Sequence, residues 1–209
     1  MRITPWGWAA IIAGAGFLLS RTATAADKML TKEQRTAAII EKAERYGIPP
    51  AVALAVFEIE SGGAGFAKDG RMIIRYEPHI FAEYSDKTSS ANRAGQAAEW
   101  DNFDRASAID PTAAMLAISM GGPQIMGFNF KTIGFDTVRD MFQAFSTSEE
   151  AQIDGFFAFC EKNGLIKAAQ QGDWTAFARG YNGKGQVGYD TKMKQRHAAY
   201  VAKGYQGVA

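Results

Sequence analysis

Residues 53–63 have the sequence ALAVFEIESGG, an apolar run that ends in a carboxylate and then in two glycines. The run predicts a helix over residues 50–60 that is apolar almost all round, which is typical of a buried central helix. Glu60 closes this helix. Burial removes water from its carboxyl group, and the negative end of the helix dipole disfavours the ionised form, so both effects raise its pKa. Such a carboxyl group can stay protonated near neutral pH and act as a general acid.

The flanking segments predict a mainly α domain of the α+β class, with this helix at its centre and a small β-hairpin as its only sheet. A capping box at residues 31–34 predicts a helix that ends at Gly47. Residues 71–76 are β-prone and predict a short strand, whereas the polar residues 85–105 lack periodicity and predict a surface excursion. Further helices are predicted over residues 111–120, 137–145, 148–162, 173–181 and 191–203, with Asp110, Asp136, Ser146 or Ser148, and Asp173 as N-caps.

The length and composition predict one globular domain preceded by an export segment. The chain has 209 residues, of which 47% are hydrophobic and 22% charged. In residues 1–26, a basic start precedes an uncharged run at residues 5–20 and a small-residue cleavage site at residues 23–25. The run is shorter than the roughly 20 residues that span a bilayer, which favours a cleaved signal peptide over a permanent anchor. Its weak hydrophobicity also allows an uncleaved segment that sits in the membrane only transiently. We therefore expect the domain at residues 27–209 to be periplasmic or secreted, and to contact the membrane only if residues 5–20 are retained.

The charge and the metal-binding residue types exclude several function classes. Removal of residues 1–26 takes away two of the 23 basic residues and none of the 22 acidic ones, which leaves a formal charge of −1. This balance argues against nucleic acid as a partner. Cys160 is the only cysteine, which excludes an intramolecular disulfide, and its apolar surroundings predict a buried side chain. His79 and His197 lack a helical metal-ligand spacing, so no metal or other cofactor is expected, and a monomer is expected.

Two carboxylates are candidates for the chemistry of the site. Glu58 and Glu60 lie about 200° apart around a helix, so only one of them can face a given cleft. Glu60 adjoins the turn, and Glu58 is expected in an ion pair on another face. Glu77 follows the predicted strand, where it could lie opposite Glu60 across a groove, with Arg75 and His79 close enough to keep it charged. One carboxyl would then act as acid, and the other would stabilise a cation, attack it or activate water. The alternative for Glu77 is a purely structural salt bridge with Arg75.

Two later segments have the side chains that a polysaccharide groove needs. Residues 121–129 have the sequence GGPQIMGFN, in which glycines allow close backbone approach to a ligand and Phe128 could stack on a sugar ring. Gln124 and Asn129 offer paired hydrogen-bond donors and acceptors. Residues 181–183, a Tyr-Asn-Gly turn, add a hydroxyl and an amide. Each segment alone is common in structural turns, but their order along the chain is informative.

These motifs in this order resemble the lysozyme-like fold shared by goose-type lysozymes and soluble lytic transglycosylases. Within it, the chain is most similar to the N-acetylmuramidase domain of bacteriophage endolysins, through residues 60–63, 75–81, 120–129 and 181–183. The resemblance implies a peptidoglycan hydrolase that cleaves the β-1,4 bond from N-acetylmuramic acid to N-acetylglucosamine. It also implies Glu60 as the acid and Glu77 as its partner. The expected substrate-binding residues are Ser61, His79, Gln124, Phe128, Asn129, Tyr181 and Asn182.

Two alternatives remain from the sequence. A lytic transglycosylase uses one glutamate as acid and then base, and closes a 1,6-anhydro-muramic ring instead of admitting water. A non-catalytic peptidoglycan-binding protein would retain the groove without turnover. Either a phage lysis enzyme or a bacterial hydrolase would fit the predicted export.

Overall fold

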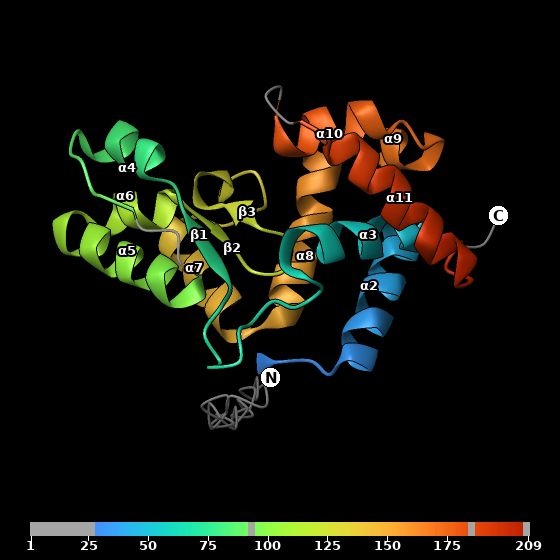
Figure 1. Ribbon diagram of the computed structural model, residues 1–209, viewed down its shortest axis with the longest axis horizontal. Coiled ribbons are helices and arrows are strands. Elements are labelled where there is room, and N and C mark those ends of the chain that lie inside the picture. The colour runs from blue at the N-terminus through green and yellow to red at the C-terminus, as the bar shows by residue number, and fades with distance from the viewer. Residues whose placement is uncertain (1–27, 92–94, 184–186, 207–209) are drawn as a thin grey trace, which may run out of the picture.

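The computed structural model describes residues 28–91, 95–183 and 187–206, so the predicted export segment lies outside the described residues. Within the described ranges the chain is mainly helical with a small sheet, which confirms the predicted class (Figure 1). The helices are α2 (Lys32–Tyr46), α3 (Pro50–Ser61), α4 (Pro78–Ser85), α5 (Gln96–Ile109), α6 (Pro111–Leu116), α7 (Val138–Thr147), α8 (Glu149–Lys162), α9 (Ile166–Gln171), α10 (Trp174–Asn182) and α11 (Tyr189–Ala202). The strands are β1 (Ile74–Tyr76), β2 (Ile118–Met120) and β3 (Ile125–Met126), and a 3-10 turn, η1 (Gly127–Asn129), follows β3.

Helix α3 is the central helix that its sequence predicts. All residues from 50 to 57 are buried, because α2 and α11 pack against faces that carry no polar side chain. Gly62 ends the helix in the left-handed conformation with φ of 68°, and its N–H bonds back to Glu58. The helix therefore ends abruptly, one residue after Glu60.

The small sheet has three antiparallel strands in the order β1-β2-β3. Ile74 pairs with Met120 and Tyr76 with Ile118, so the buried side chains of the two strands lie on one face. The prediction of one helix over residues 111–120 was therefore wrong at its C-terminal end. Helix α6 stops at Leu116 because residues 118–120 gain strand partners on both sides.

Residues 96–105 form most of helix α5 and are not the predicted surface excursion. The buried face of α5 includes Glu99 and Asn102 beside Phe103 and Ala106, at helical spacing. Glu99 accepts a hydrogen bond of 2.9 Å from the backbone N–H of Tyr76. Asn102 accepts one of 2.6 Å from Arg105 of the same helix. Because both polar groups have partners, they can be buried, and the helical period is invisible in hydrophobicity alone.

Most predicted helix starts are confirmed. Thr31 and Gln34 form the capping box of α2, and Asp110, Ser148 and Asp173 cap their helices as expected. The cap of α7 is Thr137, in a capping box with Asp140, so the prediction of Asp136 was wrong by one residue. The short helices α4 and α9 had no predicted counterpart.

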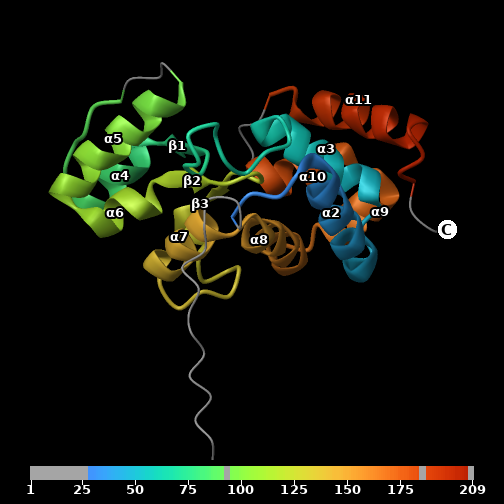
Figure 2. The same ribbon diagram turned by 90° about the horizontal axis from the view of Figure 1, so that it is seen from below.

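The helices lie in two groups around α8. Figure 1 shows α4, α5 and α6 with the sheet on one side, and α2, α3, α9, α10 and α11 on the other. Helix α8 lies between the groups in that view and in the view from below (Figure 2). Within the described ranges, every helix is too short or too polar to cross a membrane.

The glycines of residues 121–127 approach other parts of the protein closely. A Cβ on Gly121 would lie 2.5 Å from Gln152, one on Gly122 would lie 2.9 Å from Phe57, and one on Gly127 would lie 1.9 Å from the Met115 carbonyl oxygen. These glycines are therefore required for packing, which differs from their expected role of admitting a ligand to the backbone.

Gly121→Ala is expected to destabilise the fold by about 1–3 kcal/mol more than Gly134→Ala. Both glycines have positive φ, 72° and 92°, so both variants share the backbone strain of a left-handed alanine. Only the alanine at 121 meets Gln152, whereas the space around position 134 is open. Urea unfolding of the two variants measures the difference, and equal free energies of unfolding would contradict this packing role.

Candidate active site

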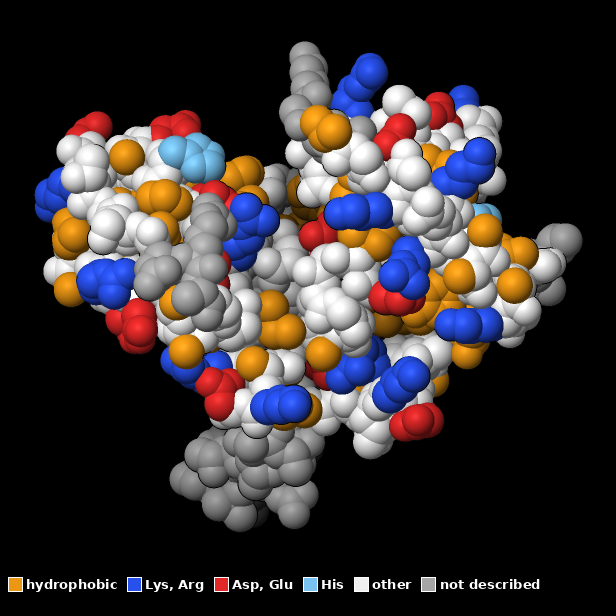
Figure 3. Space-filling model, viewed as in Figure 1, with side chains coloured by type: hydrophobic (Ala, Val, Ile, Leu, Met, Phe, Trp, Pro, Cys, Tyr) orange, Lys and Arg blue, Asp and Glu red, His pale blue; other side chains and the backbone are white. Residues whose placement is uncertain are grey.

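A groove of about 520 Å³ separates the two groups of helices. Figure 3 shows the surface hollowed between them at the upper edge of the view. Its walls come from the end of α3, from β1 and the residue after it, from residues 119–129, and from the ends of α8 and α10. The lining residues are Glu60, Arg75, Glu77, Ser119, Gln124, Ile125, Met126, Phe128, Asn129, Phe159, Asn163, Gly180, Tyr181, Asn182 and Gly183.

Glu60 lies in the last turn of α3 with its carboxyl group largely removed from solvent. Burial raises its pKa above the ordinary value of 4.5. Hydrogen bonds from Tyr189 and Asn182, and the positive charges of Lys192 and Arg75, oppose this rise and are outweighed by it. None of the described residues donates a hydrogen bond to the buried Oε1 atom within bonding distance. The site therefore holds a carboxyl group that retains its proton at higher pH than an ordinary glutamate.

Glu77 lies on the other wall of the groove, directly after β1. Its backbone N–H donates a 2.8 Å hydrogen bond to the carbonyl oxygen of Ala117, which fixes the main chain at this point. Its side chain is 18% exposed and pairs with Arg75, with 2.9 Å between Oε1 and Nε. His79 Nδ1 lies 3.8 Å from the other oxygen. The groove thus brings together two carboxyl groups in unlike surroundings, one desolvated and one ion-paired.

Gln124 and Tyr181 line the groove, but their polar atoms are bonded within the protein. Gln124 Oε1 accepts a 2.7 Å hydrogen bond from Ser119 Oγ, and Nε2 donates to the Gly121 carbonyl oxygen at 2.8 Å. The Tyr181 hydroxyl donates a 2.7 Å bond to the carbonyl oxygen of Pro123. Both side chains therefore hold residues 121–124 in place as one wall of the groove.

Phe128, Asn129 and Asn182 also line the groove, and Phe128 is 38% exposed although it is a large apolar side chain. Ser61 and His79 are not among the lining residues. The Ser61 hydroxyl donates a 3.1 Å hydrogen bond to the Phe57 carbonyl oxygen one helical turn earlier. The His79 side chain is 73% exposed beside Glu77.

Glu58 forms an ion pair with Arg196 of α11, with 3.0 Å between Oε1 and Nη1. This confirms the expectation that Glu58 is paired on a face of α3 other than the one that carries Glu60. Only one of the two helix-end carboxylates therefore belongs to the groove.

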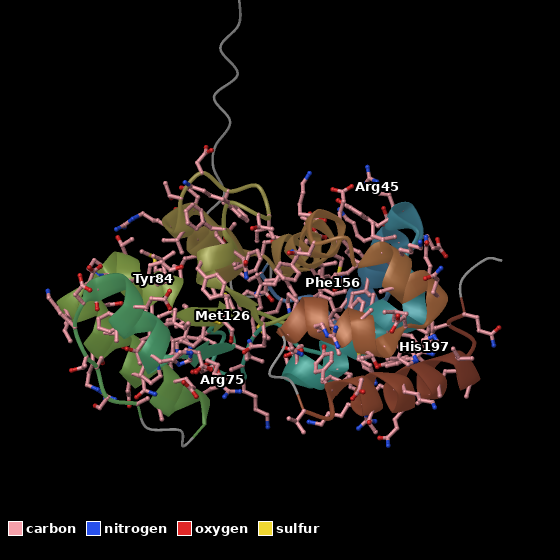
Figure 4. The ribbon with its side chains drawn as sticks, turned by 90° about the horizontal axis from the view of Figure 1, so that it is seen from above. Arg45, Arg75, Tyr84, Met126, Phe156 and His197 are labelled. Atoms are coloured by element: carbon pink, nitrogen blue, oxygen red, sulfur yellow. The ribbon has the colours of Figure 1, made fainter. Side chains whose placement is uncertain are left out.

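Tyr189 and Lys192 of α11 lie near Glu60 and lower its pKa, and neither was identified from the sequence as a neighbour of Glu60. Burial and the neighbouring Glu60 raise the pKa of Tyr189 well above its ordinary value. No local motif marks these residues, because only the packing of α11 against α3 brings them to the carboxyl. Figure 4 shows Arg75 and Met126 on the sheet side of the molecule, facing the helices around Phe156, with His197 and Arg45 farther away on the helical side.

Within the described ranges, no three His, Cys, Asp or Glu side chains are grouped to hold a metal ion. Cys160 is buried as expected, and burial raises the pKa of its thiol. A desolvated carboxyl group and an ion-paired one in the same groove are suited to proton transfer and charge stabilisation.

The groups around Glu60 determine the pH at which activity is expected to fall on the alkaline side of the kcat/KM profile. If Glu60 is the general acid that the sequence predicts, activity is lost as the pH rises through its pKa, which burial raises above 4.5. Lys192 lowers this pKa, so Lys192→Met is expected to move the alkaline limb of kcat/KM to higher pH. Lys194→Met, two residues further along the same helix, is the control and should leave the limb in place. A limb that stays or moves to lower pH in Lys192→Met would contradict the assignment.

Comparison with known proteins gives the family. The family model for N-acetylmuramidase matches residues 49–201. The crystal structure of the endolysin of Burkholderia phage AP3 superposes with a TM-score of 0.69 at 32% sequence identity, over 81% of this chain and 71% of the endolysin chain. A search of curated proteins finds no match. The family match covers most of the chain and includes both groove carboxylates. The protein therefore belongs to the N-acetylmuramidase family, with a lysozyme-like fold.

Proposed function

We propose that Glu60 and Glu77 carry out the cleavage of peptidoglycan that defines an N-acetylmuramidase. The observation that carries this assignment is the pairing, in one groove, of a desolvated carboxyl group with an ion-paired one. Most glycoside hydrolases use two carboxyl groups in different protonation states, one to donate a proton and one to oppose the positive charge that develops on the sugar. The family places this chemistry on the β-1,4 bond between N-acetylmuramic acid and N-acetylglucosamine.

The proposed reaction begins when protonated Glu60 transfers its proton to the glycosidic oxygen as the bond to C1 of the muramic residue breaks. Glu77, held by Arg75, opposes the charge of the oxocarbenium-like transition state. Water supplies the hydroxyl that ends on C1, and the proton it loses is taken up by a groove carboxylate. The products are a muramic acid with a free reducing end and an N-acetylglucosamine with a free 4-hydroxyl.

The remaining groove residues are proposed to bind the glycan strand. Phe128 presents an exposed aromatic face, which suits stacking against a sugar ring, and Asn129 and Asn182 provide amides beside it. Gln124 and Tyr181 act through the shape of the wall that they hold. Ser61 and His79 lie outside the lining, so they are proposed to contribute only through neighbouring residues.

Residues 1–26 are proposed to deliver the enzyme to the cell wall. The support is the sequence pattern of an export signal, together with a substrate that lies outside the cytoplasmic membrane. We also propose that the enzyme acts as a monomer.

The test is the identity of the new chain ends. Residues 27–209 are incubated with purified peptidoglycan, and the soluble products are reduced with borohydride and identified by mass spectrometry. Reduced muramic acid ends are the expected result. Reduced N-acetylglucosamine ends would show that the enzyme cleaves the other glycosidic bond of the strand, which contradicts the proposal. Muramic acid ends in the 1,6-anhydro form, which resist reduction, would show a transglycosylase.

A further inference from the structure

A buried carboxylate joins the start of the described chain to the turn that follows Glu60. Glu149, the first residue of α8, is only 1% exposed. Its Oε2 atom accepts hydrogen bonds from the backbone N–H of Leu30 at 2.8 Å and from Arg35 Nη2 at 3.1 Å. Its Oε1 atom accepts from the backbone N–H of Gly65 at 2.7 Å and from Arg35 Nε. One side chain thus binds residues 28–35, which we call the N-terminal arm, and the catalytic turn, residues 61–65.

Gly65 is also hydrogen-bonded to the segment that leads into β1, on the opposite wall of the groove. Its carbonyl oxygen accepts a 3.0 Å hydrogen bond from the N–H of Ile73, the residue before β1, and the Ile73 carbonyl oxygen accepts one of 2.8 Å from the N–H of Gly121. Since β1 contains Arg75 and is followed by Glu77, the position of Gly65 affects both walls. A Cβ on Gly65 would lie 2.0 Å from Gln152 Oε1, so the turn has no free space behind it.

Gln152 lies one helical turn after Glu149 and holds the third segment of the groove. Its Oε1 atom accepts a 2.8 Å hydrogen bond from the N–H of Gly122, and its Nε2 atom donates one of 2.8 Å to the Phe145 carbonyl oxygen. Gln152 is fully buried. The start of α8 therefore fixes the catalytic turn, the approach to β1 and residues 121–124 from behind.

The buried charge of Glu149 depends on Arg35 for neutralisation. The guanidinium faces both carboxylate oxygens, and its Nη2 atom also donates a 2.9 Å hydrogen bond to the Leu30 carbonyl oxygen. A buried carboxylate that loses such a partner must either move toward water or take up a proton. Either change weakens its hold on the Gly65 N–H.

We propose that Arg35 and Glu149 are positioning residues for catalysis, because their ion pair fixes the turn behind Glu60 and makes the N-terminal arm part of the catalytic unit. The arm and all of α2 precede the region that matches the family, residues 49–201. The inference rests on the proposed role of Glu60 as the acid. If the turn is displaced, water reaches the end of α3 and the Glu60 carboxyl group is less buried. Its pKa then falls, because burial is what raises it.

The test compares two ion pairs that join the same two helices. Arg35→Met removes the buried pair, and Lys42→Met removes the pair between Lys42 and Asp154, whose side chains are 27% and 54% exposed. On soluble peptidoglycan fragments, Arg35→Met is expected to lower kcat at least tenfold, with KM changed less than threefold. Lys42→Met should leave both within twofold.

The pH profile separates positioning from simple loss of stability. In Arg35→Met the alkaline limb of kcat/KM is expected at lower pH than in the parent enzyme, because Glu60 becomes more hydrated. The other charged or titratable groups that face Glu60 are Arg75 of β1, Glu77 directly after it, Tyr181 of α10, and Tyr189 and Lys192 of α11. None of them is altered, and an enzyme that is merely less stable would keep the parent limb.

Arg35→Lys keeps the inference testable if Arg35→Met does not fold. Lysine retains the charge but cannot pair with both carboxylate oxygens at once. Arg35→Lys is therefore expected to lower kcat and to move the alkaline limb of kcat/KM to lower pH, both by less than Arg35→Met. A folded Arg35→Lys or Arg35→Met enzyme with parental kcat and limb would overturn the inference. Glu60→Gln is measured in parallel: its full activity would instead overturn the proposed function, whatever the Arg35 variants do.

Discussion

Glu60→Gln is expected to lower kcat/KM on peptidoglycan by about 10²–10⁴-fold, the usual contribution of a general acid. Glutamine has the shape of the carboxyl group but has no proton to give to the departing oxygen. The pocket, with Asn182, Tyr189 and Arg75 around the side chain, can accept an amide of the same size. Rate measurements on soluble peptidoglycan fragments, with circular dichroism to confirm the fold, give the comparison.

The same substitution is expected to raise stability at neutral pH. The pKa of Glu60 is higher in the folded protein than its ordinary value of 4.5. Below about pH 4.5 both the folded and the unfolded states are protonated, and the carboxyl costs nothing. As the pH rises from about 4.5 through the folded pKa, the unfolded state ionises before the folded state, and this difference lowers stability. Glu60→Gln should therefore unfold at the parental temperature near pH 3 and at a higher temperature near pH 7.

Glu58→Gln is the matched control for both effects. It lies on the same helix and forms a partly exposed ion pair with Arg196. Such pairs contribute about 0–1 kcal/mol, so activity within twofold and nearly unchanged stability are expected. Equal losses in Glu58→Gln and Glu60→Gln would show that a disturbed α3, and not a lost proton donor, explains the result.

Glu77→Gln is expected to lower kcat by at least about 10²-fold, while KM changes little, because a second carboxylate acts mainly on the charge of the transition state. The amide leaves the Arg75 guanidinium without its anionic partner on the groove wall. That positive charge would then face a developing cation. Steady-state rates with soluble fragments measure the loss, and unchanged soluble expression and circular dichroism exclude misfolding.

Asp69→Asn is the matched control for Glu77→Gln. Asp69 also pairs with an arginine two residues away, with 2.8 Å between Oδ2 and Arg71 Nε, but it is exposed and does not line the groove. Parental activity is expected. If Glu77→Gln also retains activity within a few-fold, the mechanism with two carboxylates is wrong, and one glutamate acting as acid and then base becomes the better account.

The sequence predicted α3 and the position of Glu60 because both depend on local chemistry. The apolar run over residues 50–57 favours a buried helix, and a glycine just after the last turn is a common helix end. The same holds for the caps at Thr31, Ser148 and Asp173. The position of Glu77 directly after a strand could also be predicted, because Pro78 follows it and a proline rarely continues a strand.

Tertiary partners explain what the sequence did not predict. Glu99 and Asn102 lie on the buried face of α5, so the sequence of this helix lacks an apolar stripe. The hydrogen bond from the Tyr76 N–H is what allows the Glu99 carboxylate to be buried there. The glycines at 121 and 122 suggested a ligand, whereas Gln152 and Phe57 occupy the space beside them. Neither Gln152 nor Phe57 could be assigned to this contact from the chain alone.

The residues around Glu60 show the same limit. Tyr189 reaches the carboxyl from a helix that begins more than a hundred positions later, and no short motif identifies it. Arg35 and Glu149 are 114 positions apart in sequence. Such pairs become visible only when the packing of α2, α3, α8 and α11 is known.

The most direct test of the account is a titration of the Glu60 carboxyl by ¹³C NMR, with the signal assigned by its loss in Glu60→Gln. We predict a pKa above 4.5 that coincides with the alkaline limb of kcat/KM, since the buried carboxyl would be the proton donor. A carboxyl that titrates at or below 4.5, or at a pH different from that limb, would contradict the claim that burial prepares Glu60 as the acid.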